Sequence, residues 1–482
     1  MLYDVTIIGC GVIGASIAYE LSKYKLNLLI LEADNDVANG TTKANSGIIH
    51  SGYDPKPGTL MAKLNVEGNF LAKELCKDLD VPFCQNGSLV LAFNDSELKH
   101  LQKLYERGVA NKVPDIKILT GDEVKELEPE LSSKVVGALY TPSAGIINPW
   151  EYAIALSENA VKGGAILKLC SAVTGISKKE DFFTLHTKTG DYQSKYIVNA
   201  AGLNASTIQS MVCKVNYKNM PSRGQYYLLD KSEGTRVKHT IFQCPNENGK
   251  GILVAPTVHG NLIVGPDAKD SEIDDVATDT DGLKFIATMG KKSVPNVDLR
   301  ACIRNFSGVR ANTDSSDFII EALPEVKRFI NVAGIKSPGL SAAPAIAKYV
   351  VDLLKGNGLE LTNNKNFVKT RKQIRFKELS IEEKAEVITK KPEYGRVICR
   401  CETITEGEIL DAIRSPITPI SIDAIKRRCN AGMGRCQGGF CSPRVLELLS
   451  KELNLKPTEI LQDKDGTFIL IDETKNGGAQ NV

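Results

Sequence analysis

Five of the twelve cysteines lie between Cys399 and Cys441, whereas the other seven are scattered singly before residue 303. Scattered thiols behave as small buried hydrophobic side chains. A group of thiols in a reducing compartment indicates metal ligation instead. Four thiolates suit a [2Fe–2S] cluster or a zinc ion, with a disulfide pair as a third interpretation. Zinc sites more often contain CxxC pairs than the CxC and CxxxxC arrangement found here, and the candidate ligands are Cys399, Cys401, Cys436 and Cys441.

The residues around these cysteines predict how the thiols are presented. In an extended CxC segment both thiols point to the same side, and the glycines of CQGGFC let backbone N–H groups converge on sulfur. Ser442 is a predicted N-cap and Pro443 the first helical residue, which places a helix N-terminus beside the centre. Thr405 and Glu408 form a predicted capping box of another short helix. Cys429 belongs to neither the CxC nor the CxxxxC motif.

Basic residues are concentrated in the same region. They would offset the charge of an anionic cluster or dock an acidic electron carrier. The five residues are Lys426, Arg427, Arg428, Arg435 and Arg444.

A second group of residues, at the start of the chain, predicts a dinucleotide site. The GxGxxG run directly follows a predicted strand at 4–8 and opens a predicted helix at 13–22. Its glycines permit a tight turn and close approach to pyrophosphate, and the helix N-terminus supplies N–H groups. Glu32 ends the next predicted strand, where its carboxylate can accept hydrogen bonds from a ribose. A plain glycine-rich turn is the alternative. The predicted contacts in this unit are Gly9, Gly11, Val12, Ile13, Gly14 and Glu32.

Residues 41–53 favour FAD over NAD, because small residues after the ribose-binding strand let the backbone approach a flat ring. His50 is the only one of five histidines in this segment, and its imidazole could take a hydroxyl proton as hydride passes to the flavin. Arg310 could bind a substrate anion through two hydrogen bonds. Lys336 could stabilise a reduced flavin or bind substrate. Lys250 would add a second cation for a phosphate ester. The alternatives are a structural histidine, a structural ion pair, and two ordinary surface lysines.

The remaining features place these residues in a soluble protein of several units. The chain has 482 residues, 42% hydrophobic and 24% charged, and a formal net charge of +2, which gives no reason to expect nucleic acid as a partner. No basic leader precedes the first strand and no apolar run approaches the roughly 20 residues of a membrane span. We therefore expect a cytoplasmic protein, in which any association with a membrane would come through a partner.

The run NSGIIHSGYDPKPGTLMAKLNVEG at 45–68 resembles the L-2-hydroxyglutarate dehydrogenases and type II glycerol-3-phosphate oxidases of the glycine/D-amino-acid oxidase superfamily. The run GIKSPGLSAAPA at 334–345 is similar to the C-terminal flavin-contacting loop of those families. The resemblance implies that His50 is the base and that Arg310 and Ser337 contact substrate. It implies further FAD contacts at Thr41, Thr42, Asn45, Ser46, Gly47, Ile49, Val173, Ala201, Gly202, Gly334, Lys336, Ser337, Gly339 and Leu340.

The cysteine region resembles the bacterioferritin-associated-ferredoxin-like [2Fe–2S] domain, as found in the large subunits of anaerobic glycerol-3-phosphate dehydrogenases. This resemblance implies a [2Fe–2S] cluster in place of zinc, and it implies that Cys429 is not a ligand, because relatives usually carry Thr there. Lys250 matches the oxidases better than the hydroxyglutarate enzymes. Together these resemblances imply oxidation of sn-glycerol 3-phosphate to dihydroxyacetone phosphate, with electrons leaving to a partner subunit or quinone. L-2-hydroxyglutarate, an amine or an amino acid are alternative substrates. A non-catalytic electron-transfer or redox-sensing subunit is an alternative of another class.

The predicted fold is α/β. A Rossmann-like FAD-binding domain (1–80, 145–212 and 305–358) would hold an inserted antiparallel-sheet substrate domain (81–144 and 213–304). A linker at 359–395, a small helical iron–sulfur domain at 396–453 and a tail at 454–482 would follow.

Overall fold

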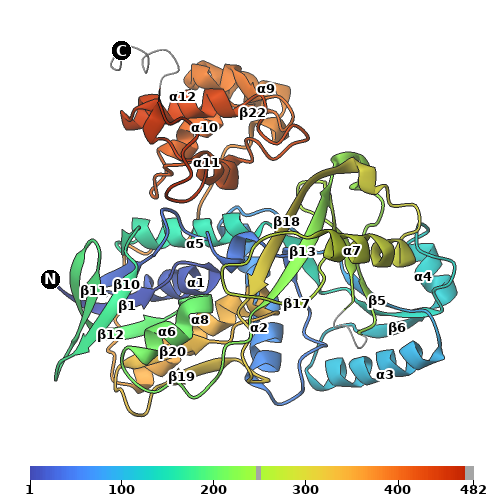
Figure 1. Ribbon diagram of the computed structural model, residues 1–482, viewed down its shortest axis with the longest axis horizontal. Helices are drawn as coiled ribbons and strands as arrows, with labels where there is room; N and C mark the ends of the chain where they lie inside the picture. The colour runs from blue at the N-terminus through green and yellow to red at the C-terminus, as the bar shows by residue number, and fades with distance from the viewer. Residues whose placement is uncertain (246–250, 473–482) are drawn as a thin grey trace, which may run out of the picture. The chain divides into compact units, whose positions relative to one another are not determined.

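The computed structural model of this chain describes residues 1–245 and 251–472 and divides into two compact units (Figure 1). The first unit comprises Met1–Leu31 and Ala38–Arg371. The second comprises Glu32–Val37 and the chain from Lys372 onward. Within the described ranges, no helix combines the length and apolar character needed to cross a membrane.

The first unit is built on a parallel sheet in the order β20–β12–β1–β2–β9. Its nucleus is the predicted strand–helix–strand unit, β1 (Leu2–Ile8), α1 (Val12–Leu21) and β2 (Leu28–Leu31). The four residues of β2 are all buried, which explains their unbroken apolar run. The remaining strands of this sheet are β9 (Ile166–Lys168), β10 (Val173–Lys178), β11 (Phe183–Thr187), β12 (Gly190–Asn199), β19 (Ile319–Ala322) and β20 (Phe329–Ala333).

Helices cover this sheet and carry small residues where they touch one another. Helix α1 packs against α5 (Pro149–Lys162) and α8 (Gly339–Gly356), and α8 also packs against α2 (Leu60–Asp78) (Figure 1). A side chain at Gly68 of α2 would come within 2.2 Å of the carbonyl oxygen of Ser341 in α8. The short helix α6 (Ala205–Ser210) contacts β12 and β20.

A second sheet of nine strands forms the inserted part of the first unit. Its order is β17–β13–β16–β15–β14–β5–β7–β6, and β18 pairs with β13. All its pairings are antiparallel except β14 with β5, which is parallel, so the predicted antiparallel sheet is confirmed with one parallel pair. The strands are β5 (Ser88–Ala92), β6 (Lys117–Thr120), β7 (Gly137–Thr141), β13 (Ser222–Leu229), β14 (Thr240–Gln243), β15 (Leu253–Pro256), β16 (Leu262–Gly265), β17 (Lys269–Asp270) and β18 (Cys302–Arg310).

Further short elements complete this unit. Three helices accompany the second sheet, namely α3 (Asp95–Ala110), α4 (Gly121–Leu127) and α7 (Thr280–Ser293). A small sheet of three strands joins the segment that carries His50 to residues 83–84 and 145–147. Its strands are β3 (Ile48–Ile49), β4 (Phe83–Cys84) and β8 (Gly145–Ile147).

The second unit is helical, with one two-stranded sheet of β21 (Val397–Cys399) and β22 (Ile404–Thr405). Its helices are α9 (Ile381–Lys390), α10 (Glu406–Ile413), α11 (Ile422–Cys429) and α12 (Ser442–Leu453). The predicted capping box of Thr405 and Glu408 is present at the start of α10. The N-cap of α12 is Cys441, one residue before the predicted Ser442, because the helix begins directly after the last ligand candidate.

Two segments differ from the prediction because sparse apolar residues anchor them. The polar segment 359–395, predicted as a linker, contains α9 and the buried ring of Tyr394, whose hydroxyl donates to Asp411 at 2.7 Å. The predicted tail is folded as far as residue 468, because Leu461 is buried and its carbonyl accepts the N–H of Ile422 at 3.0 Å.

Candidate active site and cysteine centre

The glycine-rich loop between β1 and α1 has the backbone geometry of a dinucleotide site. Gly9 has a φ of +95°, and a side chain there would come within 2.7 Å of the carbonyl oxygen of Ala200. A side chain at Gly14 would come within 1.9 Å of the Gly9 carbonyl, so α1 can approach the loop only with glycine at this position. The N–H of Val12 donates to Thr42 Oγ1 at 2.9 Å, which brings two predicted contacts together.

Glu32 directly follows β2, as predicted, and one of its carboxylate oxygens accepts the N–H of Asp34 at 3.0 Å. By its contacts, however, the segment Glu32–Val37 belongs to the second unit. The sequence gives no indication of this assignment, because the partners of the segment lie hundreds of residues away.

The segment 41–50 holds its own shape through short polar side chains. The amide of Asn45 donates to the carbonyl of Thr42 at 2.8 Å, and its oxygen accepts the N–H of Gly47 at 2.8 Å. Thr41 Oγ1 donates to the carbonyl of Val309 in β18 at 2.9 Å. Ile49 is buried in β3. These contacts fix a loop of small residues, as a flat ring system requires.

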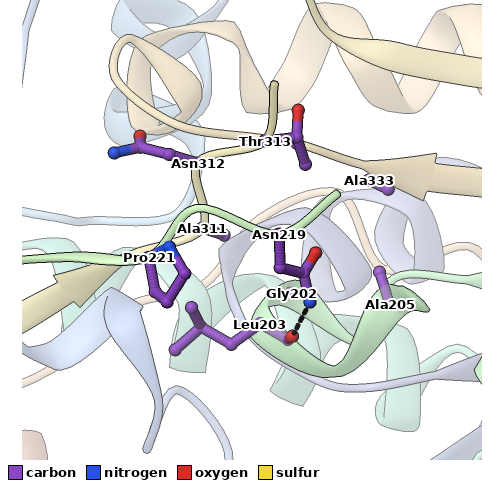
Figure 2. Close-up of a pocket in the computed structure, with 10 residues that line it drawn as sticks. Gly202, Leu203, Ala205, Asn219, Pro221, Ala311, Asn312, Thr313 and Ala333 are labelled. Carbon is purple, nitrogen blue, oxygen red and sulfur yellow. Dashed lines mark hydrogen bonds between the residues drawn. The ribbon is translucent and has the colours of Figure 1, made fainter. Parts of the chain in front are cut away.

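Two other predicted contact loops meet at a pocket of the first unit. Gly202 and Gly334, both with positive φ, line a space of about 220 Å³ that includes open solvent (Figure 2). Figure 2 also shows Asn219, whose amide donates to the carbonyl of Leu203 at 3.4 Å. Ala201 precedes Gly202, Val173 begins β10, and Gly339 and Leu340 begin α8. These predicted contacts therefore lie at the ends of strands and the starts of helices.

His50 is held by its backbone, whereas its ring is half-buried and touches an aromatic ring and a hydroxyl group. Its N–H donates to Ser341 Oγ at 2.7 Å. The imidazole stacks on Phe242 of β14, with 5.7 Å between ring centroids and 29° between planes. Its Nε2 lies 3.5 Å from Ser337 Oγ. The structure thus brings two predicted site residues, His50 and Ser337, side by side. The alternative of a buried structural histidine does not fit a ring that is half-buried.

Arg310 ends β18 and makes only neutral hydrogen bonds. Its guanidinium donates to the carbonyl of Asp267 at 3.0 Å and to Ser222 Oγ at 3.4 Å. It also hydrogen-bonds the hydroxyl of Tyr226, whose pKa burial raises while Arg310 opposes the rise. Among the described residues no carboxylate forms an ion pair with Arg310. The structural ion pair that the sequence left open is therefore absent from this part of the chain.

Tyr226 and Phe242 are site residues that the sequence did not indicate. The Tyr226 hydroxyl lies 3.3 Å from Ser46 Oγ, so it connects Arg310 to the segment that carries His50. The register of β13 with β18 pairs Tyr226 with Phe306, and their rings stack at 4.8 Å. Each residue lies in an ordinary alternating strand, and only the register of distant strands places it at the site.

The two predicted lysines have different outcomes. Lys336 Nζ donates to the carbonyl of Ser315 at 2.7 Å, which holds its loop against residues 313–317. Lys250 lies outside the described residues. The roles of both remain predictions.

The four predicted ligand cysteines form one centre made of two pairs. The thiols of Cys401 and Cys436 lie 3.6 Å apart. Cys399 and Cys441 share a hydrogen bond that lowers the pKa of Cys399 and raises the pKa of Cys441. Cys399 and Cys441 are buried, whereas Cys401 is exposed and Cys436 partly so. We call these the inner and the outer pair.

The CxC segment is not extended throughout, because β21 ends at Cys399 and a turn follows. Its two thiols belong to different pairs of one centre, Cys399 with Cys441 and Cys401 with Cys436. Backbone N–H groups do converge on sulfur as predicted: Gly432 and Glu402 donate to Cys399, and Gly438 and Phe440 donate to Cys436. Such donors favour thiolates over thiols.

This donor set fits a two-iron cluster. Among residues 1–245 and 251–472, no three Cys, His, Asp or Glu side chains surround a single-ion position. A two-iron cluster is larger than one ion, and its four thiolates need not surround a single point. All twelve cysteines are free of disulfides. Cys429 donates to the carbonyl of Ile425 at 3.4 Å in its own helix, and burial raises its pKa to about 12, as suits a thiol that is not a ligand.

The basic residues near the cysteines divide into two groups, which the sequence did not separate. Arg427 and Arg428 are buried and bind the buried carboxylate of Asp36, at 3.0 and 2.8 Å. Lys426 pairs with Asp423 at 3.5 Å. Burial excludes Arg427 and Arg428 from docking a carrier, whereas the role of these three side chains in offsetting cluster charge stays a prediction. Arg435 is exposed, and Arg444 is exposed with Glu447 as its partner at 2.7 Å.

Comparison with known proteins assigns both parts of the chain. Residues 4–353 match the family described as FAD dependent oxidoreductase, and residues 397–451 match the BFD-like [2Fe-2S] binding domain. A glycerol 3-phosphate dehydrogenase of Caloramator mitchellensis is 53% identical over 478 residues, which cover 98% of this chain and 99% of that protein.

Two further relatives match the first unit. A glycerol 3-phosphate oxidase of Mycoplasma genitalium is 36% identical over 362 residues, which cover 73% of this chain and 94% of that protein. The structure of dithionite-reduced L-alpha-glycerophosphate oxidase from Mycoplasma pneumoniae with FAD bound has a TM-score of 0.74 and 32% identity, and covers 78% of this chain and 99% of that one.

Proposed function

Because the chain belongs to the FAD dependent oxidoreductase family and carries a BFD-like [2Fe–2S] domain, we propose that it oxidises sn-glycerol 3-phosphate to dihydroxyacetone phosphate. The observation that carries this proposal is the guanidinium of Arg310. It has no carboxylate partner among the described residues, and Tyr226 connects it to the segment of His50. Likeness to the glycerol 3-phosphate dehydrogenase, over nearly the whole length of both chains, supports the choice of substrate.

Bound FAD supplies the acceptor for a hydride, and the cluster supplies a carrier of single electrons. Gly9, Gly11 and the start of α1 would hold the pyrophosphate of FAD, and the segments 41–49 and 334–340 would hold its ring system. Cys399, Cys401, Cys436 and Cys441 would hold the cluster.

His50 acts as the general base in this proposal. Oxidation of the C2 alcohol removes a hydride from carbon and a proton from oxygen, and the imidazole takes the proton. The imidazole stacks on Phe242, and the hydrogen bond of the His50 backbone to Ser341 holds this residue in place. A neutral imidazole is the form that can accept this proton.

Arg310 binds the phosphate of the substrate, with Lys250 as a second cation that the sequence alone supports. Phosphate accepts two parallel hydrogen bonds from a guanidinium. Because the phosphate is present in the ground state and the transition state alike, these contacts lower the substrate concentration needed for saturation more than they raise the limiting rate.

The electron acceptor in this proposal is a partner subunit or a quinone. The exposed outer cysteine pair supports an exit on the surface of the second unit. Any association with a membrane would come through such a partner.

An anaerobic titration of flavin bleaching with glycerol 3-phosphate tests the proposal. In Arg310→Gln the half-saturating concentration should rise roughly 10- to 150-fold, the equivalent of one charge-assisted contact of about 1.5–3 kcal/mol. Arg304→Gln, which removes an exposed arginine of the same strand, is the matched control. Glycerol lacks the phosphate, so its weak reaction should be the same in both variants. Indistinguishable titrations of the two variants would contradict the proposal.

A further inference from the structure

The two outer cysteines are each preceded by an exposed arginine. Arg400 precedes Cys401, and Arg435 precedes Cys436. The thiols of these cysteines lie 3.6 Å apart, and the N–H of Cys436 donates to the Cys401 thiol, so the two arginines flank one position on the surface. We name the surface formed by Arg400, Cys401, Arg435, Cys436 and Phe440 the outer face.

Arg400 and Arg435 differ from the other cations between residues 396 and 444. Six of the eight arginines and lysines in this range have carboxylate partners. The partners are Glu406 for Arg396, Glu452 for Arg414, Asp423 for Lys426, Asp36 for Arg427 and Arg428, and Glu447 for Arg444. Neither Arg400 nor Arg435 forms an ion pair with a described residue. The unbalanced positive charge of this region is therefore concentrated at the outer face.

Phe440 adds an apolar contact to this positive surface. Its side chain is 85% exposed, although phenylalanine is usually buried. Its backbone N–H donates to the Cys436 thiol, so the exposed ring belongs to a residue in contact with an outer ligand. An exposed aromatic side chain surrounded by charges is the composition of a protein–protein contact, with an apolar anchor and a charged rim.

We propose that the outer face is the docking site of an electron-carrier protein with an acidic surface and an apolar recess for Phe440. This inference rests on the proposed function only in that electrons leave the chain through the cluster. A neutral quinone would gain nothing from two unpaired arginines, whereas an acidic protein would be attracted by them over a distance of about 10 Å at moderate salt. Contact at this face places the carrier against the two cysteines that reach the surface.

Stopped-flow electron transfer from an acidic flavodoxin tests this inference without any substrate. Flavodoxin hydroquinone gives one electron to the oxidised enzyme and becomes the semiquinone, which is followed by its absorbance. At low salt, Arg400→Gln/Arg435→Gln should lower the second-order rate constant by about 10-fold or more and flatten its dependence on salt. Phe440→Ser should lower the rate constant while the salt dependence stays.

Arg396→Gln/Arg414→Gln is the matched control, because it removes the same charge from two exposed arginines that have carboxylate partners. It should change the rate constant by no more than about 2-fold. Oxidised cytochrome c, a basic carrier, should take electrons from the dithionite-reduced Arg400→Gln/Arg435→Gln variant at least as fast as from wild type.

Three results would overturn the inference. Equal rate constants for the two double variants would show that the outer arginines do not attract the carrier. A parallel loss with flavodoxin and cytochrome c, with a shifted cluster potential in an EPR titration, would show that the arginines tune the cluster instead. Slower oxidation of Phe440→Ser by a water-soluble quinone, with unchanged flavodoxin kinetics, would identify a quinone site. A failure of glycerol 3-phosphate to bleach the flavin would refute the proposed substrate and leave these measurements intact.

Discussion

Asp36 should control the stability of the second unit, and Asp36→Asn is the change that tests this. One carboxylate oxygen accepts hydrogen bonds from Arg428 and from the N–H of Val37, and the other accepts from both Arg427 and Arg428, at 2.8 to 3.0 Å. Asp36 and Arg428 are each 1% exposed. Arg427 would keep Asp463 as a partner after the substitution, whereas Arg428 would lose both of its hydrogen bonds to a charged carboxylate and keep its bonds to the carbonyls of Ala424 and Ile417.

Removing one member of a buried ion pair costs about 3–5 kcal/mol, because the remaining charge stays out of water without compensation. For a unit of this size, roughly 4–8 °C of melting temperature corresponds to each kcal/mol, so a decrease of about 12 °C or more is expected. Thermal loss of iron–sulfur absorbance reports the second unit. Asp34→Asn is the matched control, since it breaks an exposed pair with Lys464 worth at most about 1 kcal/mol.

The same ion pairs predict how this stability depends on pH. Burial alone would raise the pKa of Asp36, but Arg428 and Arg427 lower it below its ordinary value. A carboxyl group whose pKa is depressed in the folded state stabilises the fold fully above its unfolded pKa of about 3.9 and loses this contribution as the pH falls through the folded pKa. Wild type should therefore keep its advantage over Asp36→Asn from neutral pH down to about pH 4. The reasoning would be refuted if Asp36→Asn and Asp34→Asn melted together at neutral pH.

Three further predictions follow from the site. His50→Ala should slow flavin reduction by roughly 10²- to 10⁴-fold with FAD still bound. Stopped-flow bleaching measures this rate, and an unchanged rate would contradict the role of His50. Cys436→Ser should leave substrate-driven flavin bleaching largely intact while turnover with the natural acceptor falls sharply, and loss of bleaching in a folded, FAD-containing variant would count against this order of electron flow. Anaerobically purified protein should contain about two irons and one FAD per chain, whereas stoichiometric zinc without iron in elemental analysis would reject the cluster.

Local patterns sufficed to predict the parts of the site that depend on neighbouring residues. Gly9 and Gly14 act through one turn and one helix start, and the capping box of Thr405 and Glu408 joins residues three positions apart. Spacing, together with the resemblance to a [2Fe–2S] domain, predicts the four ligand cysteines. Their pairing could not be predicted, because β21 ends at Cys399 and directs the two CxC thiols to different partners.

Contacts between distant residues account for what the sequence did not reveal. Asp36 and Arg428 are 392 residues apart, and nothing near either residue indicates a buried partner. Tyr226 reaches Ser46 only through the register of β13, and Phe242 reaches His50 only because β14 lies beside β5. The segment 359–395 has a polar composition, and it is anchored by the two buried rings of Phe376 and Tyr394.

One anaerobic experiment addresses the central claim most directly. Substoichiometric glycerol 3-phosphate is added to the oxidised protein, and flavin absorbance and the EPR signal of the reduced cluster are recorded on the same sample, with L-2-hydroxyglutarate added to a second sample. The account predicts that glycerol 3-phosphate bleaches the flavin and produces the cluster signal, and that hydroxyglutarate does neither at the same concentration. Bleaching by hydroxyglutarate with no response to glycerol 3-phosphate would contradict the proposed function.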